Sequence, residues 1–253
     1  MLQEEIYIKS TADGTMQPSL FFRASGEEKR PLLVGLHTWS HNRSNMIQYL
    51  LRFAEEQNFN MLLPEFRGSN LTSNPNREKA CGSFYAKQDI KDTIDYVLAN
   101  ESVVDKDNIF LVGLSGGGHM AMLMAGFCPE YFRAIAAFAP ISDLARWREE
   151  TPKSYVEHID YCCRGDYSEM LLRSPINYYD TIAKANMKIF HGRVDNVVPF
   201  NQSLDFFNEM LRRYPGAKLY LDLFHGGHQF DVNLCKNWLL SQYKAPRLEE
   251  VTG

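Results

Sequence analysis

Features that would place this chain of 253 residues among membrane, secreted or nucleic-acid-binding proteins are missing from its sequence. No apolar run approaches the length needed to cross a bilayer, and the acidic start at residues 1–5 lacks the cationic and apolar parts of a signal peptide. The net charge is −4 and basic clusters are absent, which argues against a nucleic-acid partner. We therefore expect a cytoplasmic protein with neither a membrane nor a nucleic-acid partner.

The cysteines do not form the pattern of a disulfide framework or a structural zinc site. They number five and match neither zinc-finger nor C-x-x-C spacing: Cys81, Cys128, Cys162, Cys163 and Cys235. The adjacent pair Cys162 and Cys163 is expected to fill packing positions, with a redox role as the alternative. The hydrophobic content of 45% is enough for one large core, and no linker-like run divides residues 1–253, so we expect a single domain.

Strand patterns alternate with amphipathic helix patterns through most of the chain. An antiparallel pair is expected first, around a turn at residues 12–15. Strands are predicted at residues 4–9, 17–23, 31–36, 60–65, 109–112, 134–140, 187–191 and 218–223. Helices are predicted at residues 44–57, 87–100, 120–127, 202–214 and 232–243. This alternation predicts an α/β fold, a mainly parallel eight-stranded sheet with helices on both faces and its site at the carboxyl ends of the strands.

Residues 142–184 interrupt the alternation. The segment is about twice as long as a crossover needs and is rich in tyrosine and arginine. We expect a small helical cap insertion over the active site, in which Trp147 and Tyr155 bind the substrate. The alternative is a segment that only packs on the edge of the sheet. Residues 66–84, rich in Gly, Ser, Asn and Pro, predict a long surface loop.

The stretch from Asn108 to Ala121 carries the strongest chemical signal. An apolar run at residues 109–112 is followed by Gly-Leu-Ser-Gly-Gly at residues 113–117 and then by apolar residues at helical spacing. G-x-S-x-G between a strand and a helix is typical of a nucleophile elbow, where small residues must flank the serine because strand and helix are in contact. We therefore predict that Ser115 is a nucleophile. A glycine-rich turn that binds phosphate is the alternative.

A serine hydroxyl needs a base within hydrogen-bond reach and an acid that orients the base. His228 is the expected base because it follows the last predicted strand on a loop with two glycines, and His225 on the same loop is its competitor. Asp195 follows the preceding strand, which gives the chain order Ser, Asp, His of α/β-hydrolases. Asp143 and Asp222 are poorer candidates, since one begins the predicted cap and the other lies within a strand.

Stabilising the tetrahedral intermediate requires two N–H donors. One is expected from Gly116, directly after the nucleophile, and the other from Trp39, on the loop after the strand at residues 31–36. His37 is expected to organise that loop. A zinc site is the alternative use of four histidines, but their spacing matches no known ligand signature: His37, His41, His225 and His228. We predict neither a metal nor a cofactor.

Six short segments carry a family resemblance. They are Leu36-His37-Thr38-Trp39, residues 64–69 (Pro-Glu-Phe-Arg-Gly-Ser), residues 113–118, Arg173-Ser174-Pro175, residues 191–199 and residues 227–230. Together they resemble the catalytic domain of the prolyl oligopeptidase family, which contains serine peptidases and related single-domain esterases. The resemblance spans residues 5–243 and implies an α/β-hydrolase fold with Ser115 as nucleophile, Asp195 as orienting acid and His228 as base.

The sequence departs from this family in two ways. The peptidases usually carry an N-terminal β-propeller, for which this chain has no room, and their usual His-Gly-Gly is here His37-Thr38-Trp39, closer to small acyl esterases. We therefore predict a serine hydrolase of the carboxylesterase type, acting on small to medium acyl esters through an acyl-enzyme. The alternative is a serine aminopeptidase or oligopeptidase acting on short peptides. A non-catalytic binding protein on the same fold is the alternative outside enzymes.

Overall fold

The computed structural model describes residues 1–243, and within them eight strands form one sheet in the order β1-β2-β4-β3-β5-β6-β7-β8. The strands are β1 (Leu2–Lys9), β2 (Met16–Arg23), β3 (Arg30–Leu36), β4 (Asn60–Pro64), β5 (Val104–Leu114), β6 (Ala134–Phe138), β7 (Met187–Gly192) and β8 (Leu219–Phe224). β2 pairs antiparallel with β1 and β4, and all other neighbouring strands are parallel. The predicted α/β architecture and its mainly parallel eight-stranded sheet are confirmed.

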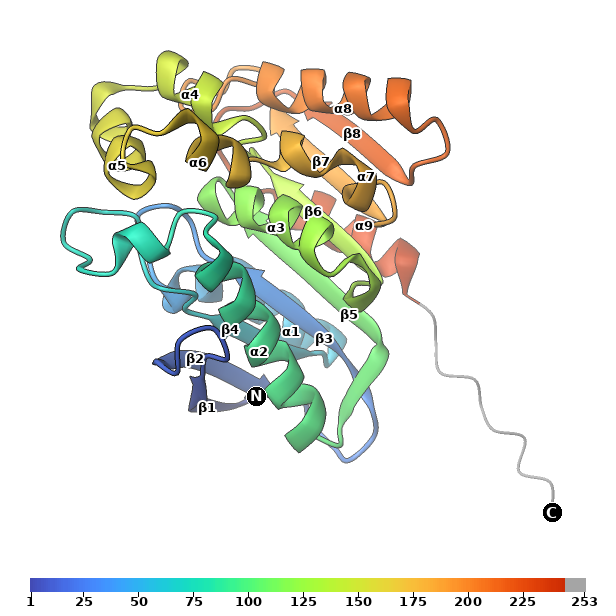
Figure 1. The fold of residues 1–253 in the computed structure, drawn as a ribbon. Helices are drawn as coiled ribbons and strands as arrows, with labels where there is room; N and C mark the ends of the chain where they lie inside the picture. The colour runs from blue at the N-terminus through green and yellow to red at the C-terminus, as the bar shows by residue number, and fades with distance from the viewer. Residues whose placement is uncertain (244–253) are drawn as a thin grey trace.

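Helices cover both faces of this sheet. They are α1 (Ile47–Gln57), α2 (Phe84–Asn100), α3 (Gly116–Phe127), α4 (Leu144–Glu150), α5 (Lys153–Cys163), α6 (Tyr167–Leu172), α7 (Tyr179–Ile182), α8 (Asn201–Arg213) and α9 (Val232–Gln242), with the short 3₁₀ helices η1 (Arg43–Met46), η2 (Arg77–Lys79), η3 (Pro129–Tyr131) and η4 (Pro175–Tyr178). Figure 1 shows α2, α3, α7 and α8 in front of the sheet and α1 and α9 behind it. Along residues 1–243, no helix is both long and apolar enough to cross a membrane.

The central strands are apolar throughout because both of their faces are covered. In β3, Leu32, Val34 and Leu36 pack in the core under α2 and α3, whereas Leu33 points to the core under α1 and α9. Strand alternation distributes the side chains of one apolar run between the two cores. The sheet is thereby fixed from both sides, which makes its carboxyl edge a rigid support for a site.

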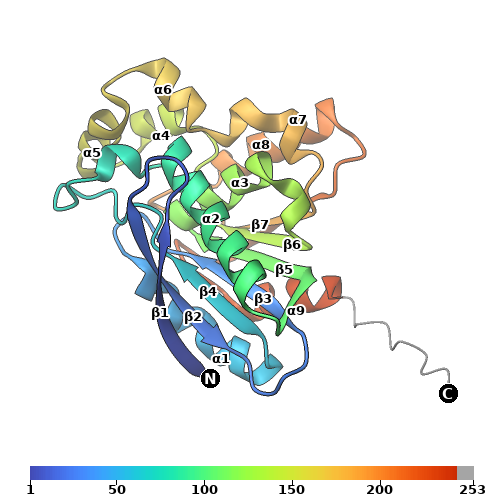
Figure 2. The ribbon, with the colours of Figure 1, turned by 60° about the horizontal axis from the view of Figure 1, so that its bottom comes forward.

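The antiparallel pair β1–β2 forms one edge of the sheet (Figure 2). Buried Arg67, on the loop after β4, ties this edge to α2: its Nε lies 2.5 Å from Asp89 Oδ2 and its Nη1 lies 2.8 Å from Asp13 Oδ2. Ser10 donates a further hydrogen bond to Asp89. The long loop predicted at residues 66–84 is therefore anchored near its start, and it contains η2.

Residues 142–184 form three helices at the end of the sheet and a fourth on its face. α4, α5 and α6 lie at the end toward which the parallel strands point (Figure 1), whereas α7 packs beside α3 over the sheet. Trp147 is 1% exposed and contacts Trp39 and Tyr155, with ring centroids 5.3 Å and 5.2 Å away. The first part of the predicted cap thus packs on the loop that follows β3.

Candidate active site

Ser115 occupies the sharp turn between β5 and α3. Its backbone angles are φ 58° and ψ −119°, a left-handed conformation that costs a non-glycine residue on the order of 1–3 kcal/mol. The N–H of Ser115 donates to the carbonyl of Phe138, and its own carbonyl accepts from the N–H of His119, each at 2.8 Å. Strand β6 and helix α3 therefore hold the serine in this strained geometry, as expected of a nucleophile elbow.

The two glycines that flank the serine are required by contact. A Cβ added to Gly113 would lie 2.0 Å from the carbonyl oxygen of Gly117, and one added to Gly117 would lie 2.1 Å from the carbonyl oxygen of Leu36. Both distances are far below any real contact, so a larger residue at either position would push strand and helix apart. This is the steric demand on which the sequence prediction of the elbow depends.

Asp195 and His228 meet on the loops that follow β7 and β8. His228 Nδ1 lies 2.7 Å from Asp195 Oδ2, while Asp195 Oδ1 accepts the N–H groups of Val197 and Val198, each at 2.9 Å. The Asp195 side chain is fully buried and that of His228 is 20% exposed. Burial opposes ionisation of Asp195, but hydrogen bonds from His191 and His228 outweigh it, so its pKa lies well below its usual range.

The two loops can approach because a glycine stands between them. A Cβ on Gly192 would lie 2.3 Å from the carbonyl oxygens of both Gly226 and Gly227. The N–H groups of Arg193 and Val194 donate across the gap to the carbonyls of Phe224 and Gly226, both at 3.0 Å. These backbone bonds fix the separation of the acid and base loops independently of the side chains.

The alternative acid and base candidates have other positions. His225 is exposed and makes no hydrogen bond within the described part of the chain, so the structure gives it neither an acid partner nor the structural bond considered for it. Asp143 caps α4 by accepting the N–H of Arg146 at 3.0 Å. Asp222 lies in β8 and pairs with Lys188 at 3.2 Å. Of the predicted acids and bases, only Asp195 and His228 are paired with each other.

The side chain of Ser115 is not hydrogen-bonded to His228 among the described residues. In residues 1–243, no hydrogen bond of the Ser115 hydroxyl is present, and Ser115 is 8% exposed. Nucleophile-to-base bonds are often long before substrate binds and shorten in the complex. Among the described residues the acid and the base are therefore bonded directly, and no bond joins the serine to the base.

The two predicted N–H donors converge beside the serine. A Cβ placed on Gly116 would lie 2.6 Å from the backbone nitrogen of Trp39, which shows how closely the two backbones approach. Neither N–H donates to another group among the residues that the structure describes. Two adjacent, unsatisfied N–H groups next to a nucleophile have the arrangement that an oxyanion hole requires.

Two buried histidines support these loops, and this role was predicted for only one of them, His37. His37 stacks on Phe66, with 3.9 Å between ring centroids, and its Nε2 contacts the carbonyl of Glu65 at 2.7 Å, in agreement with its predicted organising role. His191 is fully buried at the end of β7, and its Nε2 lies 3.4 Å from Asp195 Oδ2. Its spacing of four residues from Asp195 is the signal that could have indicated this positioning role.

The predicted substrate residues lie around Trp39. Trp147 donates its indole N–H to the carbonyl of Val197 at 3.0 Å, which connects the cap to the loop of the acid, and Tyr155 is half-buried beside it. The indole nitrogen of Trp39 is buried without a hydrogen-bond partner in residues 1–243. Trp147 therefore contacts a substrate directly only if the cap moves, whereas Tyr155 keeps an accessible surface.

The histidines considered as zinc ligands do not assemble. Within the described chain, no group of three or more His, Cys, Asp or Glu side chains is arranged to hold a metal ion. All five cysteines are buried and free. The groups gathered at the carboxyl edge of the sheet are those of acyl transfer: a strained serine, an ionised acid bonded to an imidazole, and two free N–H donors.

The order of the strands and the elbow after β5 define the chain as an α/β-hydrolase fold. Its sequence from residue 44 to residue 234 matches the prolyl oligopeptidase family of peptidases. The chain belongs to this family, as the resemblance in its motifs predicted.

Curated relatives in the family are about a quarter identical to this chain over the aligned residues. The acylamino-acid-releasing enzyme of Homo sapiens is 28% identical over 206 residues, which cover 76% of this chain and 28% of the human protein. Acylamino-acid-releasing enzyme 2 of Oryza sativa subsp. japonica is 24% identical over 234 residues, or 84% of this chain and 29% of the rice protein. The chain thus spans less than a third of the length of these relatives.

Solved structures with a similar fold come from the same group of peptidases. A Mycobacterium tuberculosis puromycin-hydrolyzing peptidase superposes with a TM-score of 0.75 at 18% identity, covering 94% of this chain and 37% of the other. An acylaminoacyl peptidase in complex with Z-Gly-Gly-Phe-chloromethyl ketone gives a TM-score of 0.73 at 19% identity, covering 94% and 40%. At this level of identity the likeness establishes the fold.

Proposed function

We propose that this protein is a serine peptidase of the acylaminoacyl-peptidase type, which releases an N-acylated amino acid from a peptide. The observation that supports serine hydrolase chemistry is the 2.7 Å bond between Asp195 and His228 at the same edge of the sheet as the strained Ser115. The named relatives, which release acylamino acids, favour a peptide substrate.

In the proposed mechanism the tautomer of His228 is set by Asp195. Because the carboxylate is ionised and can only accept, Nδ1 of His228 carries the proton and Nε2 is free to act as a base. Nε2 removes the proton of Ser115, and the alkoxide attacks the scissile carbonyl. The N–H groups of Gly116 and Trp39 stabilise the oxyanion. His228 then protonates the leaving amine, and water hydrolyses the acyl-enzyme.

The carboxylesterase prediction is replaced by its peptidase alternative. It depended on the expectation that the chain has no propeller and on the sequence His37-Thr38-Trp39, and neither changes the chemistry that the serine, acid and base perform. Both reactions pass through an acyl-enzyme, so the catalytic residues do not separate them. The family and the names of the relatives support a peptide substrate.

The experiment compares three substrates under the same conditions: N-acetyl-alanine p-nitroanilide, alanine p-nitroanilide and p-nitrophenyl acetate. We expect kcat/KM for the acetylated anilide to exceed that for the free amine by about 100-fold, because binding of the acyl group would orient the scissile bond. Hydrolysis of the activated ester is also expected and is not diagnostic. Ester cleavage with both anilides inert would restore the carboxylesterase assignment. Ser115→Ala serves as the blank for each substrate.

A further inference from the structure

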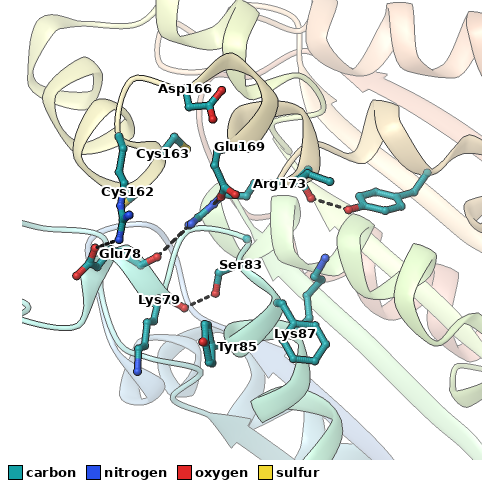
Figure 3. A pocket seen from close by; sticks show the side chains of 15 residues that line it. Glu78, Lys79, Ser83, Tyr85, Lys87, Cys162, Cys163, Asp166, Glu169 and Arg173 are labelled. Carbon is teal, nitrogen blue, oxygen red and sulfur yellow. Dashed lines mark hydrogen bonds and ion pairs between the residues drawn. The ribbon is translucent and has the colours of Figure 1, made fainter. Parts of the chain in front are cut away.

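A cavity lies between the N-terminal end of α2 and helices α5 and α6, away from the catalytic residues (Figure 3). Its volume is about 720 Å³, and Ser115, Asp195 and His228 are not among the residues that line it. Next to the lining residue Gly82, Cys81 is buried in one hydrophobic cluster with Trp39. The cavity is therefore a distinct space and not an extension of the catalytic centre.

Lys87 brings a buried positive charge to this cavity. The residue is 8% exposed, and its ammonium has neither a hydrogen-bond acceptor nor a carboxylate partner within residues 1–243. It lies near two aromatic rings, 5.1 Å from the centroid of Tyr178 and 5.7 Å from that of Phe127. One turn further along α2, Lys91 shows the usual arrangement, with its Nζ 2.7 Å from Asp95 Oδ2. Figure 3 shows the Lys87 side chain reaching into the cavity.

The other cations around the cavity are already paired. Arg173 donates to Glu169 at 3.1 Å and to the carbonyl of Glu78 at 3.2 Å, and Arg164 lies 3.3 Å from the Glu78 carboxylate. Asp166 caps α6 by accepting the N–H of Ser168. Lys79 pairs with Asp13 outside the cavity. Among the described residues, Lys87 is the lining cation without a carboxylate partner, and Asp166 is the lining carboxylate without a cation.

The start of α2 adds further donors on the same wall. Ser83 is the N-cap residue, and its hydroxyl accepts the N–H of Ala86. The N–H groups of Phe84 and Tyr85, both on the cavity lining, donate to no group in the described residues. The positive end of the helix dipole and its free N–H groups favour an anion at this position.

We propose that this cavity binds a small monocarboxylate with an aromatic or aliphatic body. The carboxylate pairs with the Lys87 ammonium at the start of α2, and the body packs against Phe84, Tyr85 and Tyr178. A monoanion suits one unpaired ammonium, because the unpaired carboxylate of Asp166 on the lining would repel a dianion such as phosphate more strongly. The proposal is independent of the hydrolase activity.

The test is calorimetric titration of the protein with phenylacetate, with neutral phenylacetamide and with orthophosphate. We expect phenylacetate to bind, the amide to bind at least about tenfold more weakly because it forms no ion pair, and phosphate not to bind. Lys87→Gln should weaken phenylacetate binding by a similar factor, and Lys91→Gln, the matched control on the same helix, should leave it unchanged. Thermal melting confirms that each variant is folded.

Three results would overturn the proposal. The first is equal affinity for acid and amide. The second is tighter binding of phosphate than of phenylacetate. The third is phenylacetate binding that survives Lys87→Gln but is lost in His228→Ala, which would place the ligand at the catalytic centre.

Discussion

The buried charged group at the catalytic edge of the sheet has hydrogen-bond partners, whereas the one in the cavity beside α2 has none among the described residues. Asp195 has hydrogen bonds to both of its oxygens, from His228 on one side and from the N–H groups of Val197 and Val198 on the other. Lys87 is buried to a similar extent but has no acceptor among residues 1–243. A buried charge whose hydrogen bonds are all made is held in one geometry. A buried charge without a partner can bind an ion of opposite charge, and it lowers the stability of the fold.

The largest loss of activity is expected when the nucleophile is replaced. Ser115→Ala should reduce kcat on N-acetyl-alanine p-nitroanilide by about 10⁴-fold or more, because no other group supplies the attacking oxygen. The melting temperature should change little, since the hydroxyl makes no bond in the described structure. Ser168→Ala, at an exposed position on α6, is the control and should be fully active. Retention of a tenth of the activity would remove Ser115 from this role.

The pairing of the acid is tested next. Asp195→Asn should lower kcat by about 10⁴-fold, because the amide would present a donor to His228 Nδ1 and favour the wrong tautomer of the base. Asp222→Asn in β8 is the matched control, and its kcat should stay within about twofold of the wild type because Asp222 is paired at the surface with Lys188. Equal losses in both variants would show that the acid has been misassigned.

Replacing a buried cation that has partners should lower the free energy of unfolding, whereas replacing one without partners should raise it. Arg67 is bonded to Asp89 and Asp13, so Arg67→Met should lower the free energy of unfolding by about 3–5 kcal/mol, since buried Asp89 would lose its counter-ion and Asp13 would keep only Lys79. Chemical denaturation at pH 7 measures the change. A neutral result would mean that water replaces the guanidinium.

Lys87→Met should stabilise the protein instead. Burial, with a smaller contribution from the charge of Arg173, lowers the pKa of Lys87 to about 8, so the folded state disfavours its charged form. This cost is fully present below pH 8 and disappears as the pH rises through the unfolded-state pKa of about 10.5. The variant should therefore gain about 2–3 kcal/mol at pH 7 and about 1 kcal/mol at pH 9.5. A gain that does not shrink with pH would assign the effect to packing.

The smallest effect is expected in the cap. Tyr155 is half-buried beside Trp39 and Trp147, so Tyr155→Ala should raise KM for the acetylated anilide by about three- to tenfold while kcat stays within about threefold. Tyr167→Ala, at an exposed position on α6, is the control. An unchanged KM in both variants would favour the simpler packing role for this part of residues 142–184.

Much of the fold and of the candidate site could be predicted from the sequence because it depends on local rules. Period-two and helical apolar patterns locate the strands and helices, and Gly113 and Gly117 around Ser115 are a steric requirement of one turn. The chain order of Ser115, Asp195 and His228 follows from the topology, since each residue comes directly after a parallel strand. Strand and helix limits differ from the prediction by a few residues, most at the start of β5, which begins at Val104 and not at residue 109.

Other features were decided by tertiary contacts between distant segments. The bond from Trp147 to Val197 and the approach of His191 to Asp195 depend on how α4 and β7 are placed, which no local pattern states. Lys87 lies at helical spacing from Ile90 and Ile94, on the apolar face of α2. The surroundings of its ammonium come from distant segments, since Phe127 of α3 and Tyr178 of η4 lie beside it. Local propensity fixes which residues face the same way, whereas burial and charge pairing depend on the segments that fold against them.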